Sequence, residues 1–254
     1  MTPLEPAVRD ALVARLTAMA DDELILGHRD SEWTGHAPLL EEDIALANIA
    51  QDEIGHALLW LELRAELDGT EPDEQAFFRD ASGFRNARLV ELPRGDWAFT
   101  MLRQFVVDTH ESALLAALQS SSYAPLAAAA AKAAKEEIFH LRHSRLWLER
   151  LALGTDESAR RLRAALERLT PYLPQLLEPL PEDAVLEQAG VLVDAPAAQR
   201  AAHRRIVSAL AELGLELPDV PPNPGGRERH GEDLVTLLID MQSVARADRD
   251  ATVW

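Results

Sequence analysis

The chain has 254 residues, 47% of them hydrophobic, which is enough for one large domain or two small ones with a buried core. Its 43 acidic and 25 basic residues give a net charge of −18, which argues against a nucleic-acid partner. Because cysteine is absent, disulfides, thiolate zinc sites and cysteine-bound iron–sulfur clusters are excluded in this chain. Any bound metal would have oxygen and imidazole ligands, and electrons for redox chemistry would come from another protein or cofactor.

The composition also indicates fold class and cellular location. Alanine and leucine are abundant, aromatic residues make up 5% of the chain, and no stretch alternates cleanly with period two. This pattern predicts an all-helical protein. No apolar run reaches the length of about 18 residues that a membrane span requires, and the N-terminus lacks the pattern of a signal peptide. We therefore expect a cytoplasmic protein with no membrane contact.

Four long helices are predicted first, at about 6–29, 40–68, 96–120 and 124–153. The second and third are separated by an irregular connection at about 69–95, rich in Asp, Gly, Arg and Pro. Short turns join the first helix to the second and the third to the fourth, which Gly154 ends. Short turns on either side of one long crossover are typical of ferritin-like four-helix bundles.

Shorter helices follow the fourth one. The sequence "TDES" resembles a helix cap, and Pro171 and Pro174 are expected to disturb the end of the helix that it starts. We predict these C-terminal elements at about 157–177, 196–213 and 232–247, with a Pro- and Gly-rich loop at 217–233. The predicted fold is all-α: a single ferritin-like four-helix bundle domain over 1–254, with one long crossover, a core bundle at about 6–153 and accessory C-terminal helices at about 157–247.

Two similar stretches, "QDEIGHALLW" from Gln51 and "KEEIFHLRHS" from Lys135, each place a glutamate three residues before a histidine. In helical steps of three and four residues, both pairs lie in the apolar stripe of their helix. A single glutamate interrupts the apolar stripe of each remaining long helix in the same way. The order along the chain is therefore Glu, Glu-x-x-His, Glu, Glu-x-x-His, formed by Glu23, Glu53, His56, Glu111, Glu137 and His140.

Four carboxylates that face one bundle interior need a compensating charge. Two unit charges about 4 Å apart repel by roughly 4 kcal/mol at an effective dielectric constant near 20, and desolvation adds several kcal/mol per ion. Two divalent ions would neutralise four glutamates, and each imidazole would add a nitrogen ligand without adding charge. Two helices giving Glu and two giving Glu-x-x-His are the ligand set of di-iron and di-manganese carboxylate proteins. Iron is the metal that we expect, and manganese fits the same ligands.

Less specific interpretations of these residues remain open. With eight histidines in the chain, about one Glu-x-x-His spacing arises by chance, and a single buried pair could be a hydrogen-bonded contact. Asp52 and Asp108 are candidates to accept a hydrogen bond from a ligand histidine, or are surface residues. Outside the apolar stripes, we expect solvent exposure for His28, His110 and His143. The basic segment "RERH" at 227–230 could contact an anionic ligand or partner, and a solvated loop is the interpretation that we favour.

Three stretches, "SEWTGHAPLLEEDIALANI", "KEEIFHLRHSRLWLERL" and "DLVTLLIDMQSVARADRDATVW", resemble the phenylacetic acid degradation family, specifically its C-type ferritin-like subunits. The resemblance covers nearly the whole chain. It implies a role within a multicomponent phenylacetyl-CoA oxygenase, a ring 1,2-epoxidase of aerobic phenylacetate catabolism. It also implies a catalytic A-type ferritin-like subunit and a small B-type subunit as partners in an oligomer. The electrons would come from NADPH through a separate reductase subunit.

In that family the A-type subunit holds the di-iron centre, and the C-type subunit is regarded as a structural partner whose ligands have been replaced. This sequence retains all six candidate ligands. One hypothesis is therefore a subunit that supports the A-type partner and carries an accessory dinuclear site, without being catalytic on its own. A catalytically competent di-iron monooxygenase subunit is the second hypothesis. The third, which the resemblance disfavours, is a metal-storage or peroxide-handling ferritin-like protein.

Overall fold

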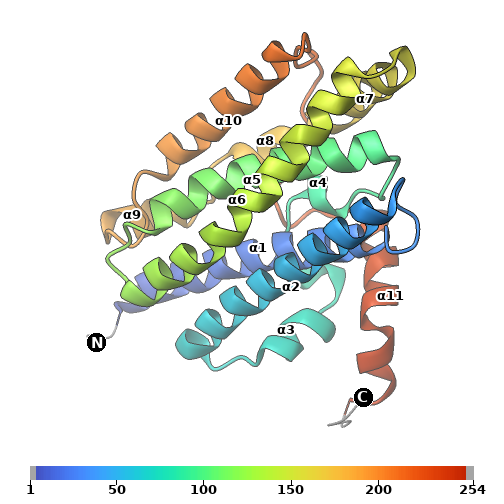
Figure 1. Ribbon diagram of the computed structural model, residues 1–254. Helices are drawn as coiled ribbons and strands as arrows, with labels where there is room; N and C mark the ends of the chain where they lie inside the picture. The colour runs from blue at the N-terminus through green and yellow to red at the C-terminus, as the bar shows by residue number, and fades with distance from the viewer. Residues whose placement is uncertain (1–3, 250–254) are drawn as a thin grey trace. The chain divides into compact units, whose positions relative to one another are not determined.

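The computed structural model describes residues 4–249, and every regular element in that range is helical (Figure 1). The protein is therefore all-α, as predicted, and is consistent with a ferritin-like helical bundle. The longer helices are α1 (Pro6–Ser31), α2 (Leu40–Asp68), α5 (Trp97–Leu118), α6 (Ala124–Leu153), α7 (Asp156–Leu169), α10 (Ala195–Glu212) and α11 (Glu232–Ala247). The shorter ones are α3 (Pro72–Phe77), η1 (Ala81–Gly83), α4 (Arg88–Glu91), η2 (Thr170–Tyr172), α8 (Leu173–Leu177) and α9 (Asp183–Gln188).

Most helix boundaries agree with the sequence prediction, and the exceptions have local causes. The helix expected at about 157–177 is divided into α7, η2 and α8, because Pro171 and Pro174 interrupt it. Thr155 starts α7 with a capping box, in which its hydroxyl accepts from the Ser158 backbone at 3.1 Å. The connection at 69–95 contains three short helices, and α9 was not predicted. Such elements are too short to show a helical period.

Glycine ends α2 and α6 in different ways. Gly69 has a φ of 76° and its N–H bonds to the Ala65 carbonyl, which is the usual left-handed cap. Gly154 ends α6 where the sequence predicts, but its φ of −80° lies outside the left-handed region. Glycine is nevertheless required there, because a Cβ atom would lie 2.6 Å from the Arg150 carbonyl oxygen.

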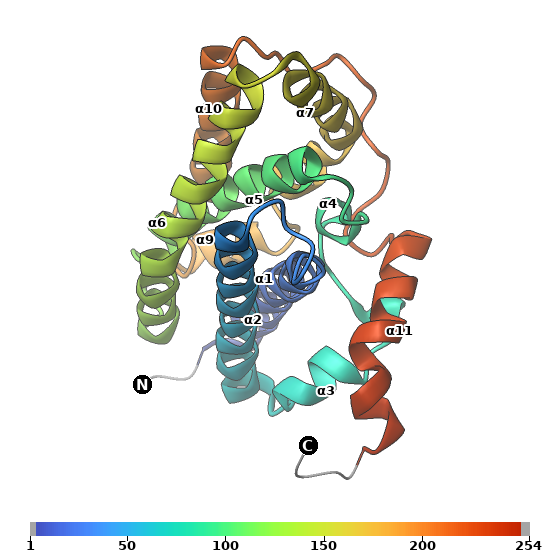
Figure 2. The same ribbon diagram turned by 45° about the vertical axis from the view of Figure 1, so that its right-hand side comes forward.

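The chain divides into two compact units. The first, residues 1–11 and 94–224, is built around α5, which packs against α6, α7 and α10 (Figure 1). Because neighbours surround it, α5 is buried on nearly every face. The second unit, residues 12–93 and 225–254, contains most of α1, together with α2 and the crossover. In this unit α11 packs against α3, η1 and α4 (Figure 2).

The apolar stripes predicted for the four long helices are buried almost completely. Only Leu67 on α2 and Trp147 on α6 are half-buried rather than buried. The glutamates and histidines that interrupt these stripes are buried with their apolar neighbours. The helical spacing therefore predicted which face of each helix is buried.

Candidate metal centre

In the second unit, α1 and α2 bring one glutamate and one Glu-x-x-His pair together. Glu23 on α1 is 3% exposed, while Glu53 and His56 on α2 are 0% and 3% exposed. One potential ligand atom from each residue lies within 4.8 Å of those of the other two. The Nδ1 atom of His56 is 3.4 Å from Glu23 Oε2, and Trp60 Nε1 donates to Glu23 Oε1 at 3.4 Å. These three candidate ligands therefore form one buried group, and their binding of a metal stays a prediction.

In the first unit, the corresponding residues lie on α5 and α6, which pack together. Glu111 is 6% exposed, and Glu137 and His140 are each 1% exposed. The i, i+3 spacing places the last two on one helix face, with His140 Nδ1 3.4 Å from Glu137 Oε2. All six candidate ligands are therefore buried, three in each unit. Their convergence on one dinuclear site stays a prediction.

Asp108 and Asp52, the two acidic residues considered as partners of the ligands, differ in their surroundings. Asp108 is fully buried on α5, and it accepts hydrogen bonds from Gln104 Nε2 at 2.8 Å and from Ser144 Oγ at 2.5 Å. Ser144 lies one turn after His140 on α6, so its bond to Asp108 joins α6 to α5 beside the candidate ligands, whereas the Gln104 bond lies within α5. Asp52 is half-buried on α2. Gln104 lies seven residues before Glu111 and Ser144 four after His140, so helical spacing predicts that both lie in the apolar stripes, but it gives no sign of their bonds to Asp108.

The donor set fits a transition metal. Carboxylate oxygens and imidazole nitrogens are ligands that iron and manganese share, and the three-residue group Glu23, Glu53 and His56 offers both kinds within reach of one ion. Burial makes such a group unfavourable as a set of free charges, because carboxylates lose solvation. The residues present are therefore chemically suited to hold a cation.

The expectation that three histidines outside the stripes are solvated is wrong for His110, which is 6% exposed. The cause is that α5 is surrounded by other helices, so that a position outside its predicted stripe is also covered. His28 and His143 are half-buried. Burial lowers the pKa of His28 from its ordinary value, although Glu32 acts in the opposite direction.

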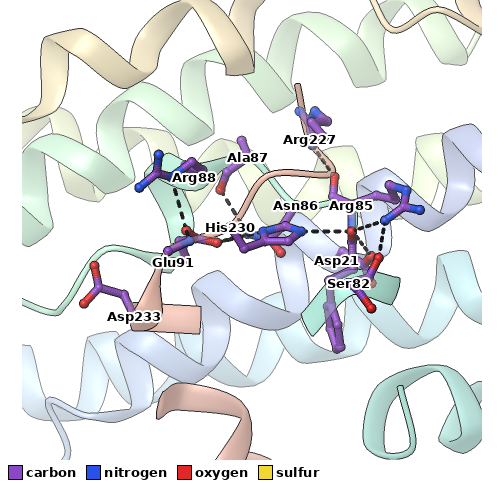
Figure 3. Close-up of polar contacts among 12 residues, drawn as sticks. Asp21, Ser82, Arg85, Asn86, Ala87, Arg88, Glu91, Arg227, His230 and Asp233 are labelled. Atoms are coloured by element: carbon purple, nitrogen blue, oxygen red, sulfur yellow. Dashed lines mark hydrogen bonds and ion pairs between the residues drawn. The ribbon is translucent and has the colours of Figure 1, made fainter. Parts of the chain in front are cut away.

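A second buried polar group, which we name the crossover cluster, lies in the same unit as Glu23, Glu53 and His56. It joins α1 to the crossover and to the loop before α11 (Figure 3). Its charged members are Asp21, Asp22, Arg79, Glu91, Arg227 and His230.

In the crossover cluster Glu91 is 1% exposed and accepts from the Gly231 backbone at 2.7 Å. The Nδ1 atom of His230 lies 2.9 Å from Glu91 Oε2, and its Nε2 atom lies 3.0 Å from the Phe84 carbonyl oxygen (Figure 3). Both ring nitrogens thus lie within hydrogen-bonding distance of an oxygen atom. Arg29 on α1 adds a bond to the Glu91 carbonyl at 2.8 Å.

The two aspartates of α1 bind the crossover cluster from the other side. Asp21 is fully buried, and it accepts from the guanidinium of Arg79 and from the Arg85 backbone at 2.7 Å. Asp22 accepts from the Ala87 backbone and from Arg227 Nη1, both at 2.6 Å.

The expectation of a solvated "RERH" segment is therefore wrong for two of its residues. The side chains of Arg227 and His230 are 11% and 5% exposed, because the loop folds back onto carboxylates of α1 and α4.

No helix within residues 4–249 is both long enough and apolar enough to cross a membrane.

Comparison with known proteins places the chain in a family. Residues 2–254 match the family model described as phenylacetic acid catabolic protein. The chain is 39% identical over 238 residues to the C-type subunit of 1,2-phenylacetyl-CoA epoxidase from Escherichia coli strain K12, an alignment that covers 92% of this chain and 96% of that one. It is 27% identical over 188 residues to the A-type subunit of the same epoxidase, covering 72% of this chain and 60% of that one. The chain therefore belongs to the phenylacetic acid catabolic protein family.

Proposed function

We propose that this chain is the C-type subunit of a phenylacetyl-CoA 1,2-epoxidase, which supports a catalytic A-type subunit and carries a dinuclear carboxylate metal site of its own. The observation that carries the first part is the 39% identity to the C-type subunit of an epoxidase, over 96% of the length of that relative. The weaker similarity to the A-type subunit, at 27% identity, supports a common origin for two subunits of one complex.

The metal site rests on the two groups of buried ligands. Glu23, Glu53 and His56 would supply ligands from one unit. The other unit would supply Glu111, Glu137 and His140, whose burial and helical spacing match the first group. Four ionised glutamates and two divalent ions balance in charge, which removes the cost of burying the carboxylates alone. A bound di-iron centre would supply the capacity to activate oxygen. Dimanganese is the alternative.

The remaining partners belong to the same proposal. Phenylacetyl-CoA is the substrate of the complex, and a small B-type subunit and a reductase that takes electrons from NADPH complete it. This chain contains no cysteine, so it cannot hold a cysteine-bound cluster for electron transfer. That composition agrees with electrons delivered by a separate protein.

Reconstitution tests the assignment. The chain should co-purify with an A-type subunit, and a complex assembled from the other subunits without this chain should lose most of its oxygen-dependent epoxidation of phenylacetyl-CoA. Adding the chain back should restore the activity. If the A-type subunit neither binds the chain nor requires it, the proposed function is wrong.

The retained ligands favour one second candidate, a subunit that is itself a competent di-iron oxygenase. Turnover by this chain and the reductase, without any A-type subunit, would establish it. The Glu53→Ala variant serves as the control, because it removes a candidate ligand and should abolish such turnover. If activity appears only when the A-type subunit is present, the supporting role is favoured instead.

A further inference from the structure

A pocket of about 630 Å³ lies in the first unit, formed by α8, α10 and the loop at 217–222. Small-molecule sites usually have volumes of about 300–1,000 Å³ and mostly apolar walls with a few polar groups. Both features are present here. The apolar walls include Leu173, Pro174, Leu177, Pro196, Leu217 and Val220.

One face of α10 forms the polar side of this pocket. Gln199, Arg200, His203 and Arg204 lie on the face that the 3.6-residue helical period brings together. Its apolar positions, among them Ala202 and Ile206, are fully buried, and α10 packs against α5. The helix is thus held by its apolar side while it presents one amide and three basic side chains to the pocket.

Gln199 is a buried polar residue whose amide oxygen makes no hydrogen bond to the described part of the chain. The residue is 6% exposed, and among residues 4–249 its side-chain Oε1 atom has no hydrogen-bond partner. An acceptor buried in this way is unfavourable unless something donates to it. Gln199 is among the residues that line the pocket, so a rotation of its side chain would bring the buried amide oxygen to an N–H or O–H group of a bound molecule.

The mouth of the pocket is basic, although the whole chain carries a net charge of −18. Arg200, His203 and Arg204 are exposed on α10, and Glu178 is the one acidic residue among the lining side chains. Arg200 lies 4.0 Å from Asp194, so this ion pair is long and exposed. Guanidinium groups in this position are suited to bind a carboxylate or phosphate.

The wall opposite α10 is attached to the rest of the unit. The backbone N–H of Asn223 donates to the Pro171 carbonyl at 2.6 Å, which connects the proline-rich loop to η2. Prolines at 218 and 222 restrict the loop further. The pocket is therefore bordered by a restrained segment.

From these observations we propose that this pocket binds a small organic anion with an apolar body and an N–H or O–H donor. The apolar body contacts the leucines and prolines, the donor binds Gln199 Oε1, and the anionic group binds Arg200 and Arg204. The proposal concerns residues outside the candidate metal centre and holds whether or not the proposed epoxidase function is correct.

Three matched probes test the proposal on the full chain by calorimetric titration. Phenylacetylglycine has all three features: an aromatic body, an amide N–H and a carboxylate. 5-Phenylpentanoate retains the body and the carboxylate but lacks the donor, and N-ethyl-2-phenylacetamide retains the body and the amide but lacks the charge. We expect phenylacetylglycine to bind at least about tenfold more tightly than either of the other two.

Two variants assign the contacts. Gln199→Leu should weaken phenylacetylglycine binding by at least about fivefold and leave 5-phenylpentanoate unchanged, because only the first probe has the donor. The double variant Arg200→Gln/Arg204→Gln should weaken both carboxylates and leave N-ethyl-2-phenylacetamide unchanged. Arg205→Gln is the matched control, since Arg205 is exposed on the same helix and does not line this pocket.

The proposal is overturned if none of the probes binds saturably, or if the three bind equally. It is also overturned if Arg205→Gln weakens binding as much as the double variant does, because the effect would then be a general one of surface charge. The arginines are exposed, so their replacement should not prevent folding. The arginine variants therefore keep the test decisive even if Gln199→Leu fails to fold.

Discussion

Two groups of buried carboxylates lie in one unit and share one helix, yet their surroundings differ. Asp21 and Asp22 on α1 accept hydrogen bonds from the guanidinium groups of Arg79 and Arg227. They also accept from backbone N–H groups at 2.7 Å and 2.6 Å. Glu23, the next residue, lies 3.4 Å from His56 Nδ1 and 3.4 Å from Trp60 Nε1. Consecutive helical residues point about 100° apart, so these neighbours face different surroundings.

The difference shows how burial alone fails to identify a functional carboxylate. In the crossover cluster the protein supplies its own cations, and the ion pairs connect α1 to the crossover and to the loop before α11. At Glu23, Glu53 and His56 the neighbouring side chains are of the kinds that bind metals. We therefore expect substitutions in the first group to alter mainly stability, and substitutions in the second to alter mainly the response to metal.

The largest expected effect is that of Arg79→Met in the crossover cluster. The change leaves the fully buried Asp21 without its guanidinium partner, and losing one member of a buried ion pair costs about 3–5 kcal/mol. Urea denaturation measures the loss. Arg160→Met is the control, because Arg160 pairs with Glu157 in solvent and should contribute little. A loss below about 1 kcal/mol for Arg79→Met would show that the pair is not structural.

Glu53→Gln should behave in the opposite way. It removes a buried negative charge, so the metal-free protein should be no less stable than the wild type. Mn(II) at about 100 times its dissociation constant should stabilise the wild type by about 2.7 kcal/mol for each ion bound, and this gain should be absent in the variant. Glu62→Gln, an exposed change on the same helix, should retain the gain. If Glu53→Gln destabilises the metal-free protein as Arg79→Met does, the distinction between the two groups fails.

A smaller effect is expected for His230→Leu. The imidazole contacts the Glu91 carboxylate and the Phe84 carbonyl, and the loss of a hydrogen bond to a buried charged group costs about 2 kcal/mol. Amide hydrogen exchange should show the loss first in α11, since residues 225–231 connect it to the crossover. His36→Leu, in an exposed loop, should leave the exchange of α11 unchanged. Equal effects from the two variants would contradict a structural role for His230.

The smallest effect comes from the exposed ion pairs of α7. Hydrogen bonds from Arg160 and Arg161 lower the pKa of Glu157 to about 2. A lowered pKa means that Glu157 stabilises the folded chain above its ordinary pKa of 4.5, and that this contribution is lost as the pH falls toward about 2. Titration of the Glu157 carboxyl carbon by NMR measures the pKa directly. A midpoint near 4.5 would show that solvent screens the pairs completely.

Helical spacing predicted much of this molecule from the sequence. The bounds of α2 and α6 and the burial of all six candidate ligands follow from the apolar stripes, because a period of 3.6 residues identifies the covered face. The crossover cluster could not be predicted in this way. Asp21 and Arg79 are 58 residues apart, and Asp22 and Arg227 are 205 apart. Their pairing depends on where the irregular segments return to α1, which no local pattern encodes.

The same reasoning explains the errors at single residues. His110 lies outside the predicted stripe of α5 but is buried, because other helices surround α5. How many helices pack around α5 depends on the tertiary structure and cannot be predicted from the sequence of α5 alone. Gln199 belongs to an amphipathic helix whose sequence does not reveal a pocket, since the opposite wall comes from a proline-rich loop. Patterns within one helix therefore predict burial, whereas the partners of a buried polar group depend on segments far apart in the sequence.

The central claim is that both groups of buried ligands serve one dinuclear site, and anaerobic titration of the metal-free chain with Fe(II) tests it most directly. Calorimetry should give about two ions per chain, accompanied by a rise in melting temperature. The double variant Glu53→Ala/Glu137→Ala, which removes one ligand from each unit, should lose both the binding and the rise. A rise in melting temperature that survives both substitutions would contradict the assignment of the site.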